Sequence, residues 1–520
     1  MTVRFVARLA IAIATLLGSA VLCWGQPPGF KFGKAAGDDP AAPTARTASA
    51  MAPVEPGAGG TWVADEDQNK VLEIPFHGGD EASGDAPPVG DMSAADMSGG
   101  DMSGGEGPCQ CEECSGQNGG DPGRHGHGGL GKYLVFTDLW TEVHSHRRTW
   151  VAVDYLSMWA KGNQVPALVT TSPIGTPQAD VGRLPVSATT SILYGDDRVD
   201  LNQRNGARIN IGYWLVDGEF WGVEGQYFAL QPKHTPFHAT SIFSDGIQPG
   251  DQYLARPFFN VDPNPPGPRQ DALIVAMNDF VLAGSQGPLD GTIDVKTTSN
   301  VQSAGALLRK LVWIDFTKQC RVDFLFGYRF FRIDDSVIIQ DESIFTPQSG
   351  PLPGPIAFRG EDIFSAKNIF NGGELGLKYQ HYHGPVSLEL IGKCAFGNNH
   401  QNVYINGSTN FIVDGFSTTF VGDLLTQPTN IGTYKRDVFA VLPEANVNLR
   451  FDITRNLRAT MGYTYIYTNR TQRSGDAIDI NVNPTQIQGG TLDGPAQPAF
   501  AFRDTPFWVH GVSAGLEYRW

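Results

Sequence analysis

The sequence predicts an all-β fold, a closed antiparallel transmembrane β-barrel with an even number of strands, preceded by a disordered segment. Three observations predict it. From Trp150 onward, apolar and polar residues alternate with a period of two, as in strands with two unlike faces. The connections between these strands alternate long and short, as in outer-membrane barrels. The chain also closes on an aromatic residue that follows apolar residues at every second position.

The first 25 residues are predicted to be a signal peptide. Arg4 and Arg8 give a positive start, and the apolar run 9–23 is shorter than the roughly 20 residues of a spanning helix. Leu22 directly before Cys23 fits a lipoprotein cleavage site poorly, which favours export without a lipid anchor. No later stretch is long and apolar enough for a spanning helix, so membrane residence would require a barrel.

Residues 26–147 are predicted to be a disordered, acidic segment rich in Gly, Pro, Met and Ser. The repeat "DMSAADMSGGDMSGG" offers too little apolar surface to offset the entropy of ordering it. One cluster of candidate metal ligands lies here, made of thiols and imidazoles: Cys109, Cys111, Cys114, His125 and His127. Their spacing is not that of a zinc finger, and no folded scaffold surrounds them. The sequence therefore predicts no metal and no cofactor.

Residues 148–520 are predicted to form the barrel. Ten convincing strands are expected at 150–161, 206–215, 220–231, 291–312, 321–334, 369–380, 386–398, 437–452, 457–469 and 506–520. The stretch "NVYINGST" and the two halves of 291–312 could raise the number to 12 or 14. The long connections are 162–205, 232–290, 335–368, 399–436 and 470–505; the short ones lie around Val216, Phe316, Tyr382 and Ile453. An even strand number puts the first and last residues of the barrel on the same side of the membrane. Export across the inner membrane would make that side periplasmic, so the long loops would be extracellular.

One face of each predicted strand is polar and would line the lumen. The residues predicted to face it are Arg208, Glu224, Asp323, Arg329, Glu374, Lys378, Arg458, Glu517 and Arg519. Mixed signs suit either a hydrated lumen or one that is filled by ion pairs. About eight strands leave room only for side chains, whereas roughly 16 to 18 leave a channel. The sequence leaves conduction open.

The closing stretch "HGVSAGLEYRW" contains a G-x-S-x-G pattern around Ser513, which serine hydrolases use as a nucleophile elbow. An elbow needs a following helix and a later histidine, and the five residues after Gly515 supply neither. Ser513 is therefore predicted to be a lumen-facing strand residue, and the sequence predicts no catalytic residue.

The patterned part of the chain resembles the planctomycete outer-membrane β-barrel porin-like proteins. The resemblance covers roughly 150–520 and rests on several blocks in matching order, among them "GARINIGYWL", "FLFGYRFFRIDDS", "FNGGELGLKYQ" and "FWVHGVSAGLEYRW". It implies an outer-membrane barrel and supplies no established substrate. Outer-membrane proteins in general end in an aromatic assembly signal, which Trp520, Tyr518 and Leu516 fit. The predicted partners are the outer-membrane bilayer and the barrel-assembly machinery, and the oligomeric state is left open.

The predicted function is that of a porin-like or structural surface protein with a polar lumen and long extracellular loops, and not an enzyme. The net charge of -16 argues against nucleic-acid binding, because no basic stripe is present to neutralise phosphates. One alternative is a secreted β-rich adhesin, which high salt would wash off membranes. A second is a barrel-embedded hydrolase, which would need a Ser-His or Asp-His pair near the membrane surface. His381, His383 and His400 are expected to be solvated or interfacial instead.

Overall fold

The computed structural model of the chain describes residues 148–185, 190–216 and 218–520. These residues form a large, mainly antiparallel sheet with a separate pair of short strands. The predicted signal peptide, the predicted disordered segment and the candidate metal ligands Cys109, Cys111, Cys114, His125 and His127 lie outside the described residues. Within the described part of the chain, no helix is long and apolar enough to cross a membrane.

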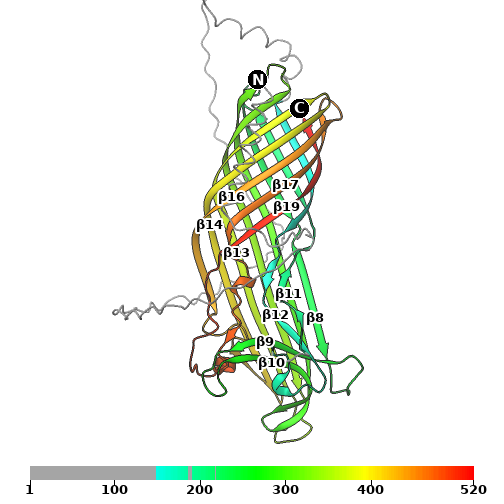
Figure 1. The fold of residues 1–520 in the computed structure, drawn as a ribbon, viewed down its shortest axis with the longest axis vertical. Coiled ribbons are helices and arrows are strands. Elements are labelled where there is room, and N and C mark those ends of the chain that lie inside the picture. Colours follow the sequence, from blue (N-terminus) through cyan, green and yellow to red (C-terminus); the bar gives the residue numbers. More distant parts are fainter. Residues whose placement is uncertain (1–147, 186–189, 217) are drawn as a thin grey trace, which may run out of the picture. The chain divides into compact units, whose positions relative to one another are not determined.

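Ten strands pair in a ring that returns to its first member (Figure 1). In order around the ring they are β1 (Thr149–Ala160), β6 (Arg204–Trp214), β7 (Trp221–Leu230), β11 (Ser285–Ile314), β12 (Cys320–Phe345), β13 (Ile356–His383), β14 (Val386–Val413), β16 (Gly432–Asp452), β17 (Leu457–Thr471) and β19 (Thr505–Arg519). The last strand pairs with the first from Trp150↔Arg519 to Ala160↔Val509. The ten predicted strands are the ten of the ring, so the prediction of an antiparallel barrel is confirmed.

The prediction that extra stretches could raise the strand number to 12 or 14 is wrong, because the strands are longer than expected. β11 is a single strand of 30 residues and pairs with β12 along most of its length. "NVYINGST" continues the 28-residue β14 and does not begin a new strand. Two of the predicted long loops, 335–368 and 399–436, consist largely of the far ends of β12, β13, β14 and β16. Neither β11 nor β14 contains a turn that could reverse the chain.

The two ends of the ring differ. At one end, here named the short-turn end, β6 and β7, β11 and β12, β13 and β14, and β16 and β17 are joined by connections of a few residues. Thr149 and Trp520 meet at the same end, where each backbone N–H donates to the carbonyl of the other at 3.1 Å. The opposite end is here named the plug end. Both ends of the barrel chain therefore lie at the short-turn end, as the prediction of an even strand number requires.

The outer face of the ring changes from apolar to polar between the two ends. On β12 the outward residues from 322 to 330 are Val322, Phe324, Phe326, Tyr328 and Phe330. Those beyond are mostly polar: Arg332, Asp334, Ser336, Ile338, Gln340, Glu342 and Ile344. All ten ring strands carry exposed large apolar side chains at the level of 322–330. The stretch 322–330 is close to the roughly 9–11 residues that a tilted transmembrane strand needs. We call this outer zone the apolar belt.

At the same level, the inner face of the ring changes from polar to apolar. On the short-turn side of this level the inward residues of β12 include Arg321, Asp323 and Arg329, and on the plug side they include Phe331 and Ile333. Phe331 and Ile333 belong to an apolar layer that crosses the lumen. The buried side chains of this layer are Leu156, Met158, Ala160, Phe228, Leu230, Val301, Phe331, Ile333, Phe370, Ala395, Ala440, Leu442, Ile466, Phe507 and Val509.

Chain segments from between the ring strands fill the plug end. We call them the plug: β3 (Val169–Pro173), β9 (Gln252–Asn260), β10 (Arg269–Leu282) and β18 (Asn481–Val482). β9 pairs with the other three, in parallel only with β18. Plug side chains such as Tyr253 and Leu254 form one core with inward residues of the ring such as Val337 and Phe364. At this end the barrel is therefore built like a water-soluble protein, apolar inside and polar outside.

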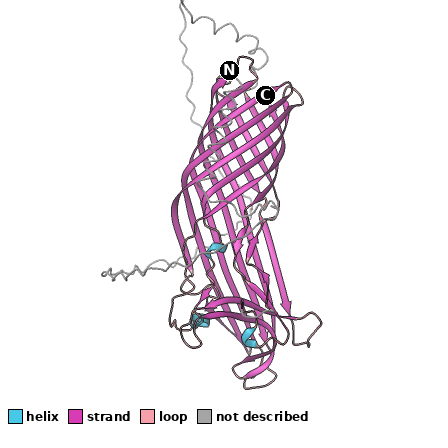
Figure 2. Ribbon diagram, in the orientation of Figure 1, coloured by secondary structure: helices cyan, strands magenta, loops and turns pink. Residues whose placement is uncertain are grey.

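The remaining elements are short. β8 (Lys233–Ser241) continues the sheet beyond β7 by pairing with β11. The others are β2 (Asn163–Val165), β4 (Ser191–Tyr194), β5 (Asp197–Val199), β15 (Phe416–Val421) and the helical turns η1 (Gln178–Asp180), η2 (Gly475–Ala477) and η3 (Pro484–Gly489). Figure 2 shows these helical turns away from the short-turn end.

Candidate functional site

The residues that the sequence assigned to the lumen lie on inward positions of the ring in its short-turn half. Seven of them, Arg208, Asp323, Arg329, Glu374, Lys378, Arg458 and Glu517, are at most 7% exposed. Glu224 and Arg519 are partly exposed. Each of the nine has at least one ion-pair partner. The lumen therefore contains both acidic and basic side chains, and these form ion pairs with one another.

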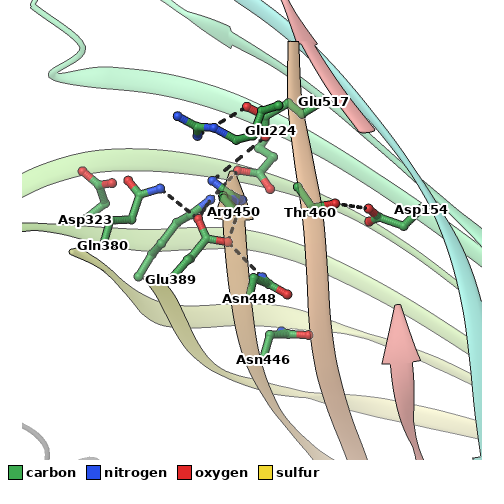
Figure 3. Close-up of polar contacts among 12 residues, drawn as sticks. Asp154, Glu224, Asp323, Gln380, Glu389, Asn446, Asn448, Arg450, Thr460 and Glu517 are labelled. Atoms are coloured by element: carbon green, nitrogen blue, oxygen red, sulfur yellow. Dashed lines mark hydrogen bonds and ion pairs between the residues drawn. The ribbon is translucent and has the colours of Figure 1, made fainter. Parts of the chain in front are cut away.

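Glu389 on β14 lies at the centre of one group of contacts (Figure 3). Its carboxylate lies 2.6 Å from Arg450 Nη2 and 3.1 Å from Lys378 Nζ. Asn448 Nδ2 and Gln380 Nε2 each donate a hydrogen bond of 2.9 Å to it. These partners come from β13 and β16, so the contacts join three adjacent strands across the inner wall.

A second group joins two carboxylates and two cations. Arg329 Nη2 lies 2.7 Å from Glu444 and Arg329 Nη1 lies 3.6 Å from Glu374. Lys393 Nζ lies 3.2 Å from Glu444 and 3.6 Å from Glu374. All four side chains are at most 3% exposed. Because removal of one partner from a buried ion pair leaves an uncompensated charge, this group stabilises the barrel only when it is complete.

Trp214 supports a third group. The guanidinium carbons of Arg309 and Arg321 lie 4.6 and 4.7 Å from the centre of its ring. Both arginines also pair with Asp323, and Arg321 Nη1 lies 2.6 Å from Glu219. Both guanidinium groups thus lie against the Trp214 ring, and Asp323 and Glu219 together balance their charges.

Space for water remains between these groups. A cavity of about 80 Å³ remains in the short-turn half of the lumen, bordered among others by Asp154, Arg208, Glu224, Lys378 and Glu389. Toward the plug end the apolar layer and then the plug core follow. Polar side chains, apolar side chains and plug strands thus occupy successive levels of the lumen.

A separate charge cluster ties the plug to the wall. Arg256 on β9 donates to Asp341 on β12 at 2.5 Å, to Asp423 at 2.6 Å and to Asp362 on β13. Arg256 is 1% exposed, and three carboxylates surround this one guanidinium. Asp362 also accepts a hydrogen bond of 2.9 Å from the backbone N–H of Thr426. The cluster therefore fastens β9, two wall strands and the 422–431 connection to each other.

The excess of acids over bases shifts the ionisation of this cluster, which lies well beyond the apolar belt. Burial and the charge of Asp423 together raise the pKa of Asp341 to about 7, against the opposing effect of Arg256. The same causes raise the pKa of Asp362 to about 6. Burial alone would lower the pKa of Arg256, but its three carboxylate neighbours outweigh burial and raise it. The arginine stays charged, while two of the acids titrate near neutral pH.

The structure places Ser513 on the inward face of β19, where it is 5% exposed. Its Oγ accepts a hydrogen bond of 3.2 Å from Arg208 Nη2. His510 lies on the outward face of the same strand and contacts Trp159, Trp508 and Tyr463. The serine and this histidine therefore point to opposite sides of the wall.

The other histidines considered as candidates lie apart from Ser513, and one of them forms an Asp-His pair. His381 Nδ1 lies 3.2 Å from Cys320 Sγ, and the partly exposed His400 lies 3.0 Å from Asp437 on the outer surface. His383 is exposed at the end of β13. Among the described residues, no group of three or more His, Cys, Asp or Glu side chains is arranged to hold a metal ion.

The three residues of the predicted assembly signal lie on the outward face of β19. Leu516, Tyr518 and Trp520 are 52, 51 and 49% exposed. The rings of Tyr518 and Trp520 stack with their centres 5.8 Å apart. They form an apolar row at the short-turn end of the belt.

Sequence reasoning missed several members of the charged groups. Asp154, which pairs with Arg208 at 2.9 Å, and Arg309 both occupy inward strand positions, so the period-two pattern could have identified them. Glu219 lies in a turn and carries no such signal. Arg256 lies in a segment that was expected to be a long loop, and its partners are 85 to 167 residues away in the chain.

Comparison with known proteins identifies one matching family. A family model described as "Putative beta barrel porin-7 (BBP7)" matches residues 150–520, which is more than half of the chain. No match was found among curated proteins.

Several solved outer-membrane structures are distantly similar. The outer-membrane protease OmpT of Escherichia coli is 10% identical, with 72% of this chain and 97% of that chain covered and a TM-score of 0.31. A deltaS2 mutant of the monoaromatic hydrocarbon channel TodX is 10% identical, with 72% and 90% covered and a TM-score of 0.18. The toluene transporter TodX of P. putida is 10% identical, with 72% and 89% covered and a TM-score of 0.16. Similarities this low carry no argument about activity.

Proposed function

The chain belongs to the beta barrel porin-7 family, and from that premise we propose that it is an outer-membrane barrel with a closed lumen and a structural role. In this proposal the protein presents its plug end at the cell surface and does not conduct solutes. The observation that carries it is the filling of the lumen at each successive level. Buried ion pairs occupy the short-turn half, the apolar layer follows, and the plug core occupies the rest.

The charge balance of the lumen supports the same role. A selective pore needs a water-filled path, often with a ring of one sign. Here the buried carboxylates Asp154, Asp323, Glu374, Glu389, Glu444 and Glu517 each lie within 4.0 Å of a cationic side chain. An ion that entered would meet neutralised pairs and then the apolar layer. Ten strands are also closer to the roughly eight of a side-chain-filled barrel than to the roughly 16 to 18 of a porin.

The proposed orientation puts the short-turn end and the N-terminal segment in the periplasm. Short turns on the periplasmic side and longer connections outside are the rule for such barrels. The proposed partners are the lipid bilayer around the apolar belt and the barrel-assembly machinery at the last strand, with no nucleic acid. A secreted adhesin is disfavoured, because an encircling belt of exposed apolar side chains would then face water.

The proposal excludes a catalytic role. The exposed and interfacial histidines do not meet Ser513, and the Ser513 hydroxyl faces Arg208 in the ion-paired lumen. No activity is therefore assigned to the G-x-S-x-G stretch.

Planar-bilayer recording of the refolded full chain tests the closed lumen. Insertion is first verified by the faster gel migration of the unheated protein. We expect no stable conductance steps at moderate voltage. Stable conductance steps in the wild type would show an open lumen and overturn the proposal. In that case Phe331→Ala in the apolar layer should enlarge the steps, and Phe330→Ala on the outer face should leave them unaltered.

A further inference from the structure

A groove runs along the outer wall within the apolar belt. It has a volume of about 580 Å³, and its lining is almost wholly apolar. Its floor is formed by Gly225 on β7 and Ala306 on β11, which are paired across the two strands. A Cβ added to Gly225 would meet nothing closer than the Ile211 carbonyl oxygen at 3.9 Å. At this level the floor is nearly bare backbone and is open to the outside, and toward the short-turn end Val223 and Leu308 line it.

Larger side chains stand on both sides of this floor. The walls are Ile211 and Tyr213 from β6 and Phe326 and Tyr328 from β12. Ile211, Tyr213 and Tyr328 are 53, 40 and 49% exposed, so they project away from the sheet. The Tyr328 hydroxyl is held by a hydrogen bond of 2.5 Å to Asn371 Oδ1. Two rows of projecting side chains with a gap between them form a slot that suits a narrow, flexible apolar chain.

A cation lies beyond the short-turn end of this slot. Lys310 is two residues from Leu308, which lines the slot, and both point outward from β11. Its ammonium lies 5.1 Å from the centre of the Trp221 ring. That ring in turn contacts the wall residue Phe326 edge-on, at 6.3 Å between centres. Slot and cation are therefore parts of one continuous surface.

Lys310 has no acidic partner within ion-pair distance among the residues that the structure describes. Its outward neighbours along β11 are Leu308 and Val312, which are 36 and 62% exposed. A lysine on the lipid-facing side of a barrel costs free energy, and the cost rises from the interface toward the midplane. A bound anion at this position would offset that cost.

We propose that the slot binds one acyl chain of a phospholipid whose phosphate contacts Lys310. An apolar slot that ends at an uncompensated cation matches an amphiphile with an anionic head and a straight apolar tail. Lys310 lies toward the short-turn end and the slot extends from it toward mid-belt, as a lipid of the leaflet on that side would lie. The assignment to the periplasmic leaflet rests on the orientation proposed above, whereas the site itself does not.

Native mass spectrometry of the refolded full chain in detergent provides the test, with phosphatidylethanolamine as the probe and diacylglycerol as its phosphate-free counterpart. The wild type is expected to hold one phospholipid and to prefer it to diacylglycerol at least fivefold. Gly225→Leu, which fills the slot, should lower phospholipid occupancy at least tenfold. Gly392→Leu is the matched control, because a Cβ there meets nothing within 4 Å and the residue lies outside the slot.

Lys310→Gln should abolish the preference for phospholipid over diacylglycerol while both still bind. Lys296→Gln, at an exposed outward position beyond the belt on the same strand, should leave the preference intact. If Gly225→Leu fails to fold, Ala306→Leu fills the same floor. Undiminished phospholipid binding by the folded slot variants would overturn the proposal. A wild-type dimer that dissociates in these variants would also overturn it, because the slot would then be occupied by a second copy of the chain. None of these outcomes depends on conductance.

Discussion

Phe330 and Phe331 are adjacent in β12 and point to opposite sides of the barrel wall. Phe330 is the last aromatic of the outer belt on its strand, and Phe331, 2% exposed, belongs to the apolar layer inside. The polarity of the strand reverses between them. On the short-turn side apolar residues face out and charges face in, and on the plug side the arrangement is the opposite. A single strand therefore meets the requirements of a lipid environment and of an aqueous one in succession.

The paired ring predicts behaviour in the gel and in cell fractions. The protein should fractionate with outer membranes, and its unheated form should migrate differently from the boiled form, because a closed sheet without free edges resists the detergent. High-salt washing should leave it in the membrane. Complete recovery in the soluble fraction would contradict the barrel and favour the adhesin.

Arg329→Ala should destabilise the barrel by about 3–5 kcal/mol, because it leaves Glu374 and Glu444 buried with less compensation. Arg359→Ala is the matched control. It breaks an ion pair with Glu342 whose side chains are 56 and 41% exposed, and such pairs contribute about 0–1 kcal/mol. Urea unfolding in detergent measures both. Similar losses in the two variants would show that the buried groups do not stabilise as a set.

The Arg256 cluster predicts that stability falls as pH rises. The folded-state pKa values of about 7 for Asp341 and about 6 for Asp362 exceed the ordinary value of 3.8. The folded state therefore favours the protonated acids, and this contribution is lost as pH rises from about 4 through 7. The free energy of unfolding, measured in urea, should be lower at pH 8 than at pH 5 by about 1 kcal/mol or more. One pKa unit corresponds to about 1.4 kcal/mol.

Asp341→Asn mimics the protonated acid, so it should reduce this pH dependence and raise stability at pH 8. Glu342→Gln changes a neighbouring, largely exposed acid and should leave the dependence as in the wild type. A wild type that is equally stable at both pH values would show that the cluster does not titrate in this range.

Trp520→Asp is expected to lower outer-membrane levels in cells strongly, while the purified variant still refolds in detergent. An exposed charge near the interface costs a folded barrel only about 0–1 kcal/mol, so any large effect must come from recognition during assembly. Phe451→Asp is the matched control, with the same 49% exposure near the short-turn end of β16. Equal cellular levels of both variants would show that Trp520 is an ordinary strand residue.

Ser513→Ala should leave serine-reactive probe labelling and any hydrolytic activity of the preparation unchanged. It removes one hydrogen bond from Arg208, so the cost should be confined to stability, at about 0.5–1.5 kcal/mol. Labelling that disappears in this variant would restore the hydrolase interpretation.

Period-two alternation was sufficient to predict the ring strands, because a wall between lipid and lumen imposes it on every strand. Strand length was not predictable by the same signal. After Phe330 the apolar positions of β12 change from even to odd numbers, as Ile333, Val337 and Ile339 show. A phase change of this kind looks like the end of a strand, so the continuation to Phe345 was assigned to a loop.

The sequence predicted which residues of the candidate site face the lumen, but not which of them pair. Residues such as Asp323 and Glu374 occupy the polar face of an amphipathic strand, and that face must line the lumen. Their partners were not predictable, because pairing depends on the register between strands and on rotamers. Arg256 carried no local signal, since only the folding of β9 into the plug brings it to Asp341 and Asp362.

The pairing of β1 with β19 constrains how relatives of this barrel could diverge. Both ends of the barrel chain meet at one rim, where Thr149 and Trp520 exchange backbone hydrogen bonds. In the proposed orientation, insertion of a single strand would move one end of the barrel to the other side of the membrane and remove Trp520 from the periplasmic side. A barrel that keeps the antiparallel pairing of its first and last strands can widen or narrow only by whole hairpins. Duplication or loss of a strand pair is therefore the smallest evolutionary change in strand number that preserves the pairing of β1 with β19.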